Sequence, residues 1–387
     1  MDYATQPLIF KVRKAARYVR LYGPSRTLVK VRSQYHMNRT YKRPPALQGD
    51  PGQHVGLIGA GKFAYAQIAY YLTREHGQIV RGVMDLEADR AYSLASRYGA
   101  AYASDDAERI LTDPQIDLVY VASNHSTHAD YAIRALEEGK HVHIEKPHVV
   151  TPDQLERLVD AMDGAPGRVS LGFNRPYSRI GSAVRDALAA ESGPAMLNWF
   201  IAGHEIPPDH WYFRPEEGGR VLGNLCHWTD FSLQCVPPEG RFPIEIRPTT
   251  ARDSDNDIAV TYVFGDGSVA AITFSAKGHA FEGVKERFAG HRGDTLITLD
   301  DFQHATIERG AHKQRIRQLH RDHGHKESIL AAYGLARPGA HAARTADAQY
   351  VWETGELFLR TREALESGRA LTLTSFADRR PRTPAGS

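Results

Sequence analysis

A lysine that directly follows an apolar run is the first candidate for chemistry in this sequence. Lys146 stands in the tripeptide Glu145-Lys146-Pro147, after the apolar residues 141–144. A lysine ammonium can donate a hydrogen bond to a reacting oxygen and stabilise its alkoxide character during hydride transfer, while Pro147 would keep the turn rigid. Taken alone, Glu-Lys-Pro is also typical of a surface turn. Lys146 is therefore a catalytic candidate that depends on a ligand site beside it.

A histidine in an apolar setting, His227, is the second candidate. Imidazole titrates near neutral pH, and an alcohol that loses a hydride must also lose a proton, which His227 could accept. Because Leu225, Cys226 and Trp228 surround it, the alternative is a core histidine bonded to a main-chain carbonyl. Asp230 follows three residues later and would share a helix face with His227, where it could orient the ring or bind substrate.

Aromatic and basic side chains gather shortly before this histidine. They belong to His204, His210, Trp211, Tyr212, Arg214 and Arg220. Aromatic faces suit a sugar ring and forked guanidinium donors suit a phosphate, so Trp211 and Arg220 are candidate substrate-binding residues. The alternative is an ordinary loop whose aromatic side chains cover a sheet.

A glycine-rich turn, Gly59-Ala60-Gly61-Lys62-Phe63-Ala64, is the candidate cofactor site. It directly follows an apolar run and opens a helical pattern. Gly59 permits a tight turn, Gly61 lets the backbone approach a pyrophosphate, and Ala64 keeps helix and strand close. The free N–H groups at the helix start would then face the phosphates with the positive end of the helix dipole. The turn therefore predicts a dinucleotide site.

An acidic residue at the end of the second apolar run selects between the two nicotinamide cofactors. Asp85 closes Val83-Met84-Asp85. A carboxylate at that place can accept both ribose hydroxyls of NAD, and it would repel the 2′-phosphate of NADP. The alternative is a surface turn residue that starts the next helix. We expect NAD as the cofactor.

The elements that would position these residues alternate in type. Apolar runs lie at 55–58, 79–84, 118–122, 141–144 and 168–173, and helical patterns lie at 62–75, 87–98, 105–112 and 127–138. This rhythm is typical of βαβ units and a parallel sheet. We therefore predict an α/β protein with an N-terminal Rossmann domain, a doubly wound parallel sheet, over residues 51–173.

The pattern of expected strands and helices changes after residue 173. A helix is expected at about 177–191, and alternating strands at 195–203, 257–264, 268–276, 284–290 and 294–299, with helical patterns again at 345–367. Turn signals such as Gly265-Asp266-Gly267 join the strands, as in an antiparallel sheet. Residues 174–387 are therefore predicted to form an α+β domain with a large, mainly antiparallel sheet.

At this point the chain resembles the Gfo/Idh/MocA oxidoreductase family. The matching segments, in chain order, are Gly59–Ala64, Ser123-Asn124-His125 with His128, Glu145-Lys146-Pro147, Gly172-Phe173-Asn174-Arg175, and Gly218-Gly219-Arg220 leading to His227-Trp228-Thr229-Asp230. The likeness covers about residues 54–376. It implies that the Lys146–Pro147 peptide bond is cis and that an antiparallel sheet of the second domain covers the active site and often forms the oligomer interface.

The resemblance also implies roles for particular residues. The cofactor-binding set comprises Gly59, Gly61, Lys62, Phe63, Ala64, Asp85, Ser123, Asn124, His125, His128, Glu145 and Lys146. The substrate-binding set comprises Asn174, Arg175, Trp211, Arg220, Asn224 and Asp230. Lys146 and His227 are the expected catalytic pair. Many relatives carry an acid three or four residues before the histidine, whereas Asn224 and Gly223 stand here, and an amide binds a hydroxyl but cannot ionise.

The N-terminal 50 residues differ in charge from the rest. They hold 11 Lys/Arg against two acids, while the remainder holds 37 Lys/Arg against 44 Asp/Glu, which argues against nucleic-acid binding by the main body. Leu8, Val12, Ala15, Val19 and Tyr22 form one apolar helical stripe. We interpret residues 1–50 as a basic arm and linker, docked on the chain's own body or on a neighbouring subunit, or else contacting an anionic membrane surface. The arm is expected to be dispensable for NAD binding.

Composition narrows the setting further. In 387 residues, 42% hydrophobic and 24% charged side chains are typical of a globular chain, and no apolar run approaches the roughly 20 residues that cross a bilayer. No secretory signal is seen, and Cys226 and Cys235 are expected as free thiols in a reducing cytoplasm. Hydride chemistry with NAD needs no metal, so none is expected. We predict a cytoplasmic, homo-oligomeric enzyme (dimer or tetramer), in peripheral contact with a membrane if the arm binds one.

Three functions fit these observations. The first is an NAD-dependent dehydrogenase or reductase that moves a hydride at a hydroxyl-bearing carbon of a sugar, sugar nucleotide or cyclitol. The second is a redox-neutral enzyme that holds NAD tightly and epimerises or cleaves glycosides. The third is a non-catalytic NAD-binding sensor or scaffold. Intact Lys146 and His227 favour catalysis, whereas the amide at Asn224 keeps the third alternative open.

Overall fold

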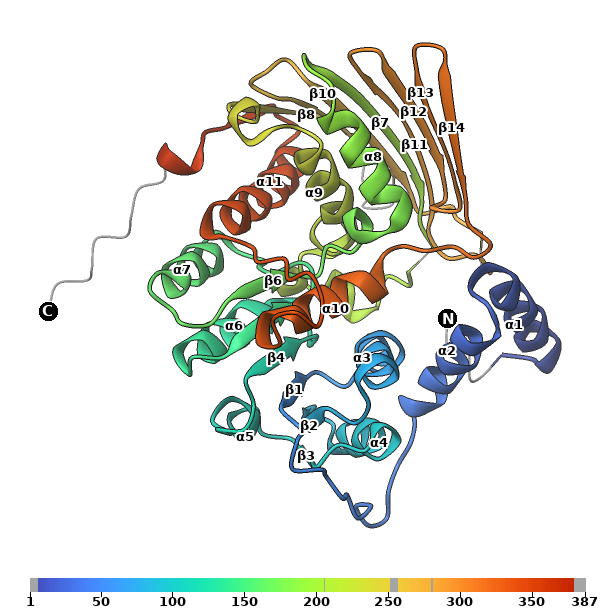
Figure 1. Cartoon of the computed structure of the whole chain (residues 1–387), viewed down its shortest axis with the longest axis vertical. Helices are drawn as coiled ribbons and strands as arrows, with labels where there is room; N and C mark the ends of the chain where they lie inside the picture. The colour runs from blue at the N-terminus through green and yellow to red at the C-terminus, as the bar shows by residue number, and fades with distance from the viewer. Residues whose placement is uncertain (1–5, 205, 251–256, 280, 379–387) are drawn as a thin grey trace, which may run out of the picture. The chain divides into compact units, whose positions relative to one another are not determined.

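The computed structural model describes residues 6–204, 206–250, 257–279 and 281–378 (Figure 1). Its contacts group into two compact units. Unit 1 comprises residues 1–148, 161–177 and 322–347, and unit 2 comprises 149–160, 178–321 and 348–387. The basic arm therefore belongs to the unit that contains the dinucleotide turn, and a late segment of the chain returns to that unit.

Unit 1 is built on a six-stranded sheet in the order β3-β2-β1-β4-β5-β6, in which every neighbouring pair is parallel. Its strands are β1 (Val55–Ile58), β2 (Val80–Met84), β3 (Tyr102–Ser104), β4 (Leu118–Val121), β5 (His141–Ile144) and β6 (Val169–Leu171). β1 and β4 are buried along their whole length, as expected for strands covered on both faces. This is the predicted doubly wound Rossmann sheet, and its strand order confirms the predicted fold class.

Unit 1 also contains helices and short helical turns, most of which join its parallel strands. They are the π-type turn η1 (Ala64–Ile68), α3 (Ala69–His76), α4 (Ala88–Tyr98), α5 (Glu108–Leu111), the 3₁₀ turn η2 (His125–Thr127), α6 (His128–Glu137), the 3₁₀ turn η3 (Arg175–Tyr177) and α10 (His325–Ala336). α7 (Pro152–Met162) carries residues of both units. The sequence patterns did not indicate β3 or α10, and α10 packs on α3 through buried residues such as Ile329 and Ala332.

Unit 2 is built on a nine-stranded sheet in the order β14-β13-β12-β11-β7-β10-β9-β8-β15. Its strands are β7 (Ala195–Ala202), β8 (Ile244–Thr250), β9 (Asp257–Val263), β10 (Val269–Ser275), β11 (Lys285–Arg292), β12 (Thr295–Asp300), β13 (His304–Arg309), β14 (His312–Arg317) and β15 (Leu371–Leu373). All neighbours are antiparallel except β7 and β10. The predicted mainly antiparallel sheet is confirmed, with four further strands, β8, β13, β14 and β15.

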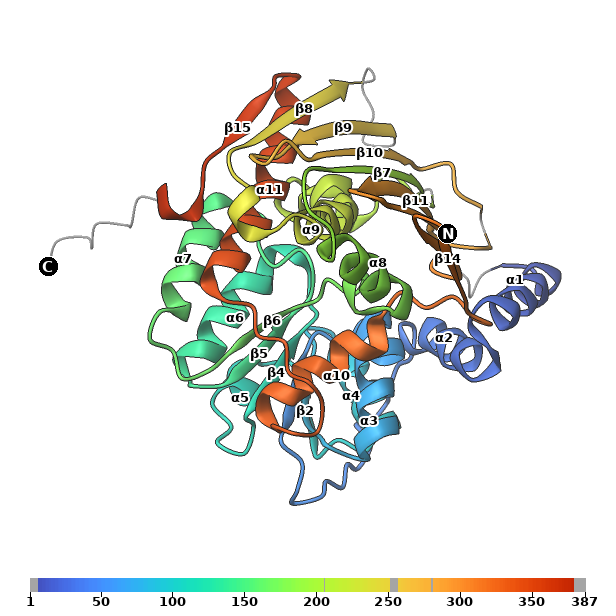
Figure 2. The ribbon, with the colours of Figure 1, turned by 45° about the horizontal axis from the view of Figure 1, so that its top comes forward.

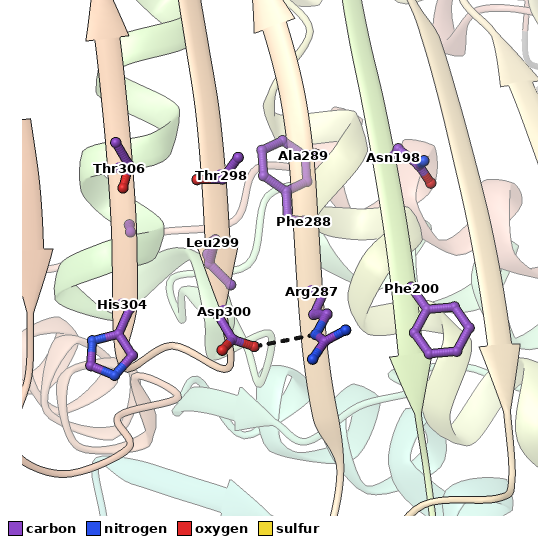
Figure 3. A pocket seen from close by; sticks show the side chains of 11 residues that line it. Asn198, Phe200, Arg287, Phe288, Ala289, Thr298, Leu299, Asp300, His304 and Thr306 are labelled. Atoms are coloured by element: carbon purple, nitrogen blue, oxygen red, sulfur yellow. Dashed lines mark ion pairs between the residues drawn. The ribbon is translucent and has the colours of Figure 1, made fainter. Parts of the chain in front are cut away.

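Helices cover one face of this sheet (Figure 2). They are α8 (Arg179–Ala189), α9 (Cys226–Gln234) and α11 (Ala348–Ser367), with the short turns η4 (Trp211–Phe213), η5 (Pro215–Glu217), η6 (Val221–Leu225), η7 (Pro238–Gly240) and η8 (Phe376–Asp378). Burial alternates residue by residue along β7 and β12, as the two-residue period of a strand requires. A hollow of about 340 Å³ on this sheet is lined by Asn198, Phe200, Arg287 and Asp300, among others (Figure 3).

The arm forms a helical hairpin of α1 (Leu8–Tyr22) and α2 (Pro24–His36) in unit 1 (Figure 1). α2 packs on η1 and α4, whereas α1 contacts mainly α2. Leu8, Val12 and Val19 of the predicted stripe remain 77%, 57% and 41% exposed. The described chain does not cover this stripe. Of the predicted alternatives, contact with a neighbouring subunit and contact with an anionic membrane surface are left.

Two further predictions can be compared with the described residues. Cys226 and Cys235 are free, buried thiols, as expected. Within the described part of the chain, no helix combines the length and apolar content that a membrane crossing requires.

Candidate functional site

The glycine-rich turn leaves β1 with the geometry that a dinucleotide needs. Gly59 has φ +92°, and a Cβ added there would lie 2.5 Å from the carbonyl oxygen of Ala122. At Gly61 an added Cβ would meet no atom within 4 Å, so the backbone is open to a ligand. Glycine is thus needed at the two positions for different reasons: Gly59 adopts a positive φ, and Gly61 leaves room for a ligand to approach the backbone. The turn fits a pyrophosphate.

Side chains hold both main-chain groups of Ala60. Its N–H donates to Asp85 Oδ2 at 2.8 Å, and its carbonyl oxygen lies 2.6 Å from His36 Nε2. The second oxygen of Asp85 accepts a hydrogen bond from the N–H of Glu87 at 2.9 Å, and Arg90 lies 3.9 Å away. Asp85 therefore stands at the end of β2 beside the turn, as the cofactor prediction requires.

His36 is a site residue that the sequence reasoning missed. It ends α2, its ring stacks on Tyr65 with centroids 4.4 Å apart, and it is 3% exposed. Burial lowers the pKa of His36, which favours the neutral ring with its proton on Nε2, toward the Ala60 carbonyl. The arm thus contacts the dinucleotide turn, and its dispensability for NAD binding stays a prediction. No local pattern could have indicated this contact across 24 residues.

The helix after the turn starts with a π-type turn. Lys62 and Phe63 precede η1, and Ala64 is fully buried, which keeps the helix close to the sheet. Phe63 lies beside the ring of His325 at 5.6 Å between centroids. The N-terminal residues of this helix stand at the carboxyl edge of β1, where phosphates bind in open α/β sheets.

The turn after β4 is tied to the lysine turn after β5 by His128. The side chain is 1% exposed, with Nδ1 2.7 Å from the Pro147 carbonyl oxygen and Nε2 3.0 Å from that of Ser123. Burial lowers the pKa of His128 although both carbonyls favour its charged form. Ser123 Oγ lies 2.7 Å from Thr127 Oγ1. His128 therefore positions two cofactor turns, while cofactor contacts by Ser123, Asn124 and His125 stay predictions.

Lys146 stands half-buried at the carboxyl end of β5. The Lys146–Pro147 bond is cis, as the resemblance implied. Glu145 is 7% exposed, with Oε1 3.4 Å from His143 Nε2, and a Cβ at Gly172 would come within 2.8 Å of its other oxygen. The turn is closely packed, and it places Lys146 at the same edge of the parallel sheet as Gly59 and Asp85.

Asn174 and Arg175 follow β6 in unit 1 and are 3% and 6% exposed. Asn174 Nδ2 donates to the carbonyl oxygen of His323 at 2.6 Å, and Arg175 Nη1 donates to Asn174 Oδ1 at 3.2 Å. Burial lowers the pKa of His325 well below its ordinary value, and the charges of Arg175 and Lys146 act in the same direction. His325 is thus a neutral histidine near the lysine turn that sequence patterns did not single out. Substrate contacts by Asn174 and Arg175 stay predictions.

In unit 2, His227 lies in the first turn of α9 and is 6% exposed. The next residue anchors the helix, because Trp228 Nε1 donates to Glu286 Oε2 of β11 at 2.7 Å and both side chains are fully buried. Trp199 and Phe231 stack edge to face on the same side of the sheet. The apolar neighbours of His227 therefore serve to seat its helix.

Asp230 is buried on α9 against α11. Tyr350 and Thr354 donate to Asp230 Oδ1, and Gln234 Nε2 donates to Oδ2 at 2.8 Å. Burial raises the pKa of this carboxyl to about 7, against the opposing hydrogen bonds. Asp230 thus joins two helices of unit 2. A substrate contact by Asp230 stays a prediction, and it would require one of these hydrogen bonds to break.

The segment before His227 provides two further polar groups. Asn224 stands in the π-type turn η6, and its buried Oδ1 has no hydrogen-bond partner among the described residues. Arg220 is 1% exposed, lies over the rings of Phe213 and Phe274, and donates from Nη2 to the His204 carbonyl at 3.1 Å. Trp211 is half-buried in η4. Asn224 Oδ1 could accept a hydrogen bond from a ligand hydroxyl, whereas Arg220 holds the segment together.

Comparison with known proteins points to one family. Residues 53–173 match the model of an oxidoreductase family with an NAD-binding Rossmann fold. The chain is 27% identical over 262 residues to scyllo-inositol 2-dehydrogenase (NAD(+)) of Bacillus subtilis, covering 65% of this chain and 75% of that relative. It is 27% identical over 264 residues to myo-inositol 2-dehydrogenase of Thermotoga maritima, covering 65% of this chain and 77% of that relative.

Solved structures share the fold at lower identity. Levoglucosan dehydrogenase in complex with NADH and levoglucosan matches with a TM-score of 0.71 at 17% identity, over 83% of this chain and 99% of that one. GenD2 from gentamicin A biosynthesis, in complex with NAD, matches with a TM-score of 0.70 at 17% identity, over 87% of this chain and 100% of that one. These likenesses extend the shared fold beyond the Rossmann domain.

Proposed function

The chain belongs to the Gfo/Idh/MocA oxidoreductase family with NAD as its cofactor, and on that premise we propose that it is a dehydrogenase or reductase of a sugar, sugar nucleotide or cyclitol. The reaction is hydride transfer at a hydroxyl-bearing carbon. The observation that carries the proposal is the shared sheet edge of unit 1. The turn at Gly59, the acid Asp85 and the lysine Lys146 all follow parallel strands at their carboxyl ends.

Each residue has a distinct task in this proposal. Bound NAD supplies the acceptor or donor of the hydride. Lys146 donates a hydrogen bond to the reacting oxygen and stabilises its developing negative charge. His227 accepts the hydroxyl proton in the oxidation and returns it in the reduction. Asn224 Oδ1, which lacks a partner in the described chain, accepts a hydrogen bond from a second hydroxyl.

The substrate class follows from the same groups. Hydride transfer at a hydroxyl-bearing carbon uses one hydroxyl of the substrate, and Asn224 Oδ1 is an acceptor for a second. A polyhydroxylated ring provides both. The two inositol 2-dehydrogenases among the relatives act on such rings by their names, which supports this class of substrate.

The test is a screen of inositols, sugars and sugar nucleotides with NAD, following the absorbance of the reduced cofactor, with Lys146→Met beside the wild type. Lys146→Met removes a positive charge from beside the reacting oxygen, and we expect turnover to fall roughly a hundredfold, or about 3 kcal/mol in the barrier. Product formed without net reduction of NAD would favour the redox-neutral alternative. NAD binding without turnover of any compound would favour the sensor.

We propose further that the chain forms a homo-oligomer through the bare face of the nine-stranded sheet. Met196, Phe200 and Leu296 are 55%, 49% and 47% exposed there, and they lie on β7 and β12 (Figure 3 shows Phe200). An apolar patch on an open sheet favours self-association. Light scattering on the wild type and Phe200→Glu should show a dimer or tetramer that the variant weakens. A monomeric wild type would refute this interface.

For the arm we propose contact with an anionic membrane surface. The stripe of α1 is exposed, and α1 and α2 together contain basic residues and no acid. Lys11, Arg13 and Arg17 flank the stripe, the pattern of a helix that lies on anionic headgroups. Sedimentation with anionic vesicles should pull down the full chain and lose it in Val12→Glu. Equal sedimentation with neutral vesicles, or a change of oligomeric state in Val12→Glu, would favour a protein partner instead.

A further inference from the structure

A second hollow, of about 310 Å³, lies in unit 1 where the arm meets the Rossmann helices. The side chains that line it are Arg32, Tyr35, His36 and Arg39 at and after α2, Tyr65 of η1, and Ser93 and Arg97 of α4. Small-molecule sites measure roughly 300–1,000 Å³, so a compact ligand fits. Neither Lys146 nor any of the predicted substrate-binding residues lines this hollow.

Its rim carries concentrated positive charge. Arg32, Arg39 and Arg97 are exposed, and in the described chain none of them forms an ion pair with a carboxylate. Burial raises the pKa of Tyr65, while the charges of Arg97, Arg32 and Arg39 act against this rise, so all three guanidinium groups lie within electrostatic reach of one hydroxyl. No acid lines the hollow. Like charges gathered without counter-ions favour an anionic ligand.

Its floor is polar and buried. His36 and Ser93 are each 3% exposed, and Tyr65 is 5% exposed. His36 Nε2 is engaged by the Ala60 carbonyl, whereas the buried Nδ1 of the same ring has no hydrogen-bond partner in the described chain. A buried nitrogen without a partner is costly unless a ligand or water completes it. A ligand here would therefore meet guanidinium donors at the rim and a buried polar floor.

We propose that this hollow binds a phosphate monoester. Guanidinium forks match phosphate oxygens in geometry and charge, and three of them carry more positive charge than a dianion needs for balance. The exposed ring of Tyr35 borders the hollow and suits the organic part of the ester. The site does not rest on the proposed hydride transfer, and its phosphate comes from a soluble sugar phosphate or from a phospholipid headgroup.

Calorimetric titration of the full chain with glucose 6-phosphate, with glucose as the neutral control, tests the site. We expect saturable binding of the phosphate ester alone, weakened about tenfold or more in Arg32→Gln and in Arg97→Gln. Arg20→Gln is the matched control, since it removes the same charge from α1 outside the hollow, and it should change the affinity less than twofold. NAD affinity should stay within twofold of wild type in all three variants.

A second arm identifies the source of the phosphate. Vesicles containing phosphatidic acid that bind Arg97→Gln more weakly than the wild type, in the absence of glucose 6-phosphate binding, would support the same phosphate site with a lipid headgroup as its ligand. The proposal fails if neither source binds, or if Arg20→Gln weakens glucose 6-phosphate binding as much as the hollow variants do. It also fails if Arg32→Gln and Arg97→Gln selectively weaken NADP, because the hollow would then belong to the cofactor site.

Discussion

The turn that begins at Gly59 is held through its own main-chain groups, whereas the helix that carries His227 is held through its own buried side chains. Gly59 packs on the main chain of Ala122, and the N–H of Ala60 bonds to Asp85, 25 residues away. The His227 helix depends on Trp228 with Glu286, 58 residues away, and on Asp230 with Tyr350, 120 residues away.

The difference shows how each kind of site tolerates change. Such a turn accepts few backbone conformations, so its key positions are glycines. A helix seated by buried polar pairs depends on each pair being complete, because an unpaired buried group is costly. Both sites nevertheless adjoin a π-type turn, η1 or η6, a local widening of the helix that is frequent at functional sites.

The largest expected effect lies in the seated helix. His227→Asn removes the proposed proton acceptor, so turnover should fall by roughly 10²–10⁴, and the neutral-range limb of the pH–rate profile should disappear. His304→Asn, a histidine exposed on β13, is the matched control and should leave both unchanged. Steady-state kinetics across pH on both variants gives the answer. Near-wild-type turnover in His227→Asn would remove the assigned role.

Asp230 should make the stability of unit 2 depend on pH. Its pKa is raised to about 7 in the folded chain, above the ordinary 3.8, so its contribution to stability is complete below about pH 4 and is lost as the pH rises through about 7. The loss is on the order of 4 kcal/mol. Urea unfolding across this range should show a shallower pH dependence in Asp230→Asn than in the wild type. The exposed Asp300→Asn is the control, and a wild-type slope in Asp230→Asn would contradict the raised pKa.

The two glycines of the cofactor turn should fail differently. Gly59→Ala forces a positive φ on alanine and brings its Cβ onto Ala122, so the free energy of unfolding should drop by about 1–3 kcal/mol. Gly61→Ala meets open space, so stability should stay within about 0.5 kcal/mol while NAD affinity falls. Chemical unfolding and NAD titration on both variants test this contrast. Unchanged NAD affinity in Gly61→Ala would mean that the pyrophosphate does not approach this residue.

The smallest expected effect tests whether the arm supports the turn. His36→Ala removes the hydrogen bond to the Ala60 carbonyl, and NAD affinity should weaken about fivefold, or about 1 kcal/mol. Leu28→Ala, an exposed position on the same helix, is the control for the integrity of the arm. If both variants bind NAD like the wild type, the arm contact has no part in cofactor binding.

Periodicity and turn chemistry carried most of the prediction of the fold. The strands at 195–203, 257–264 and 268–276 agree closely with β7, β9 and β10, because alternating burial leaves a two-residue pattern in the sequence. β13 and β14 were not indicated, since outward-facing charged residues mask that period, as in β14, where only Ile316 is buried. α10 was missed because it is buried on nearly all sides and so lacks a polar face.

By itself the sequence determined where the dinucleotide turn, its acid Asp85 and the lysine turn lie, and where the strand pattern changes from parallel to antiparallel. Each depends on residues close together in the chain, where local backbone preference and strand order leave few alternatives. Only the tertiary structure decided that His36 contacts the turn, that Asp230 accepts hydrogen bonds from α11, and that the α1 stripe is exposed. These outcomes depend on which side chains meet across the fold, and no local pattern encodes that meeting.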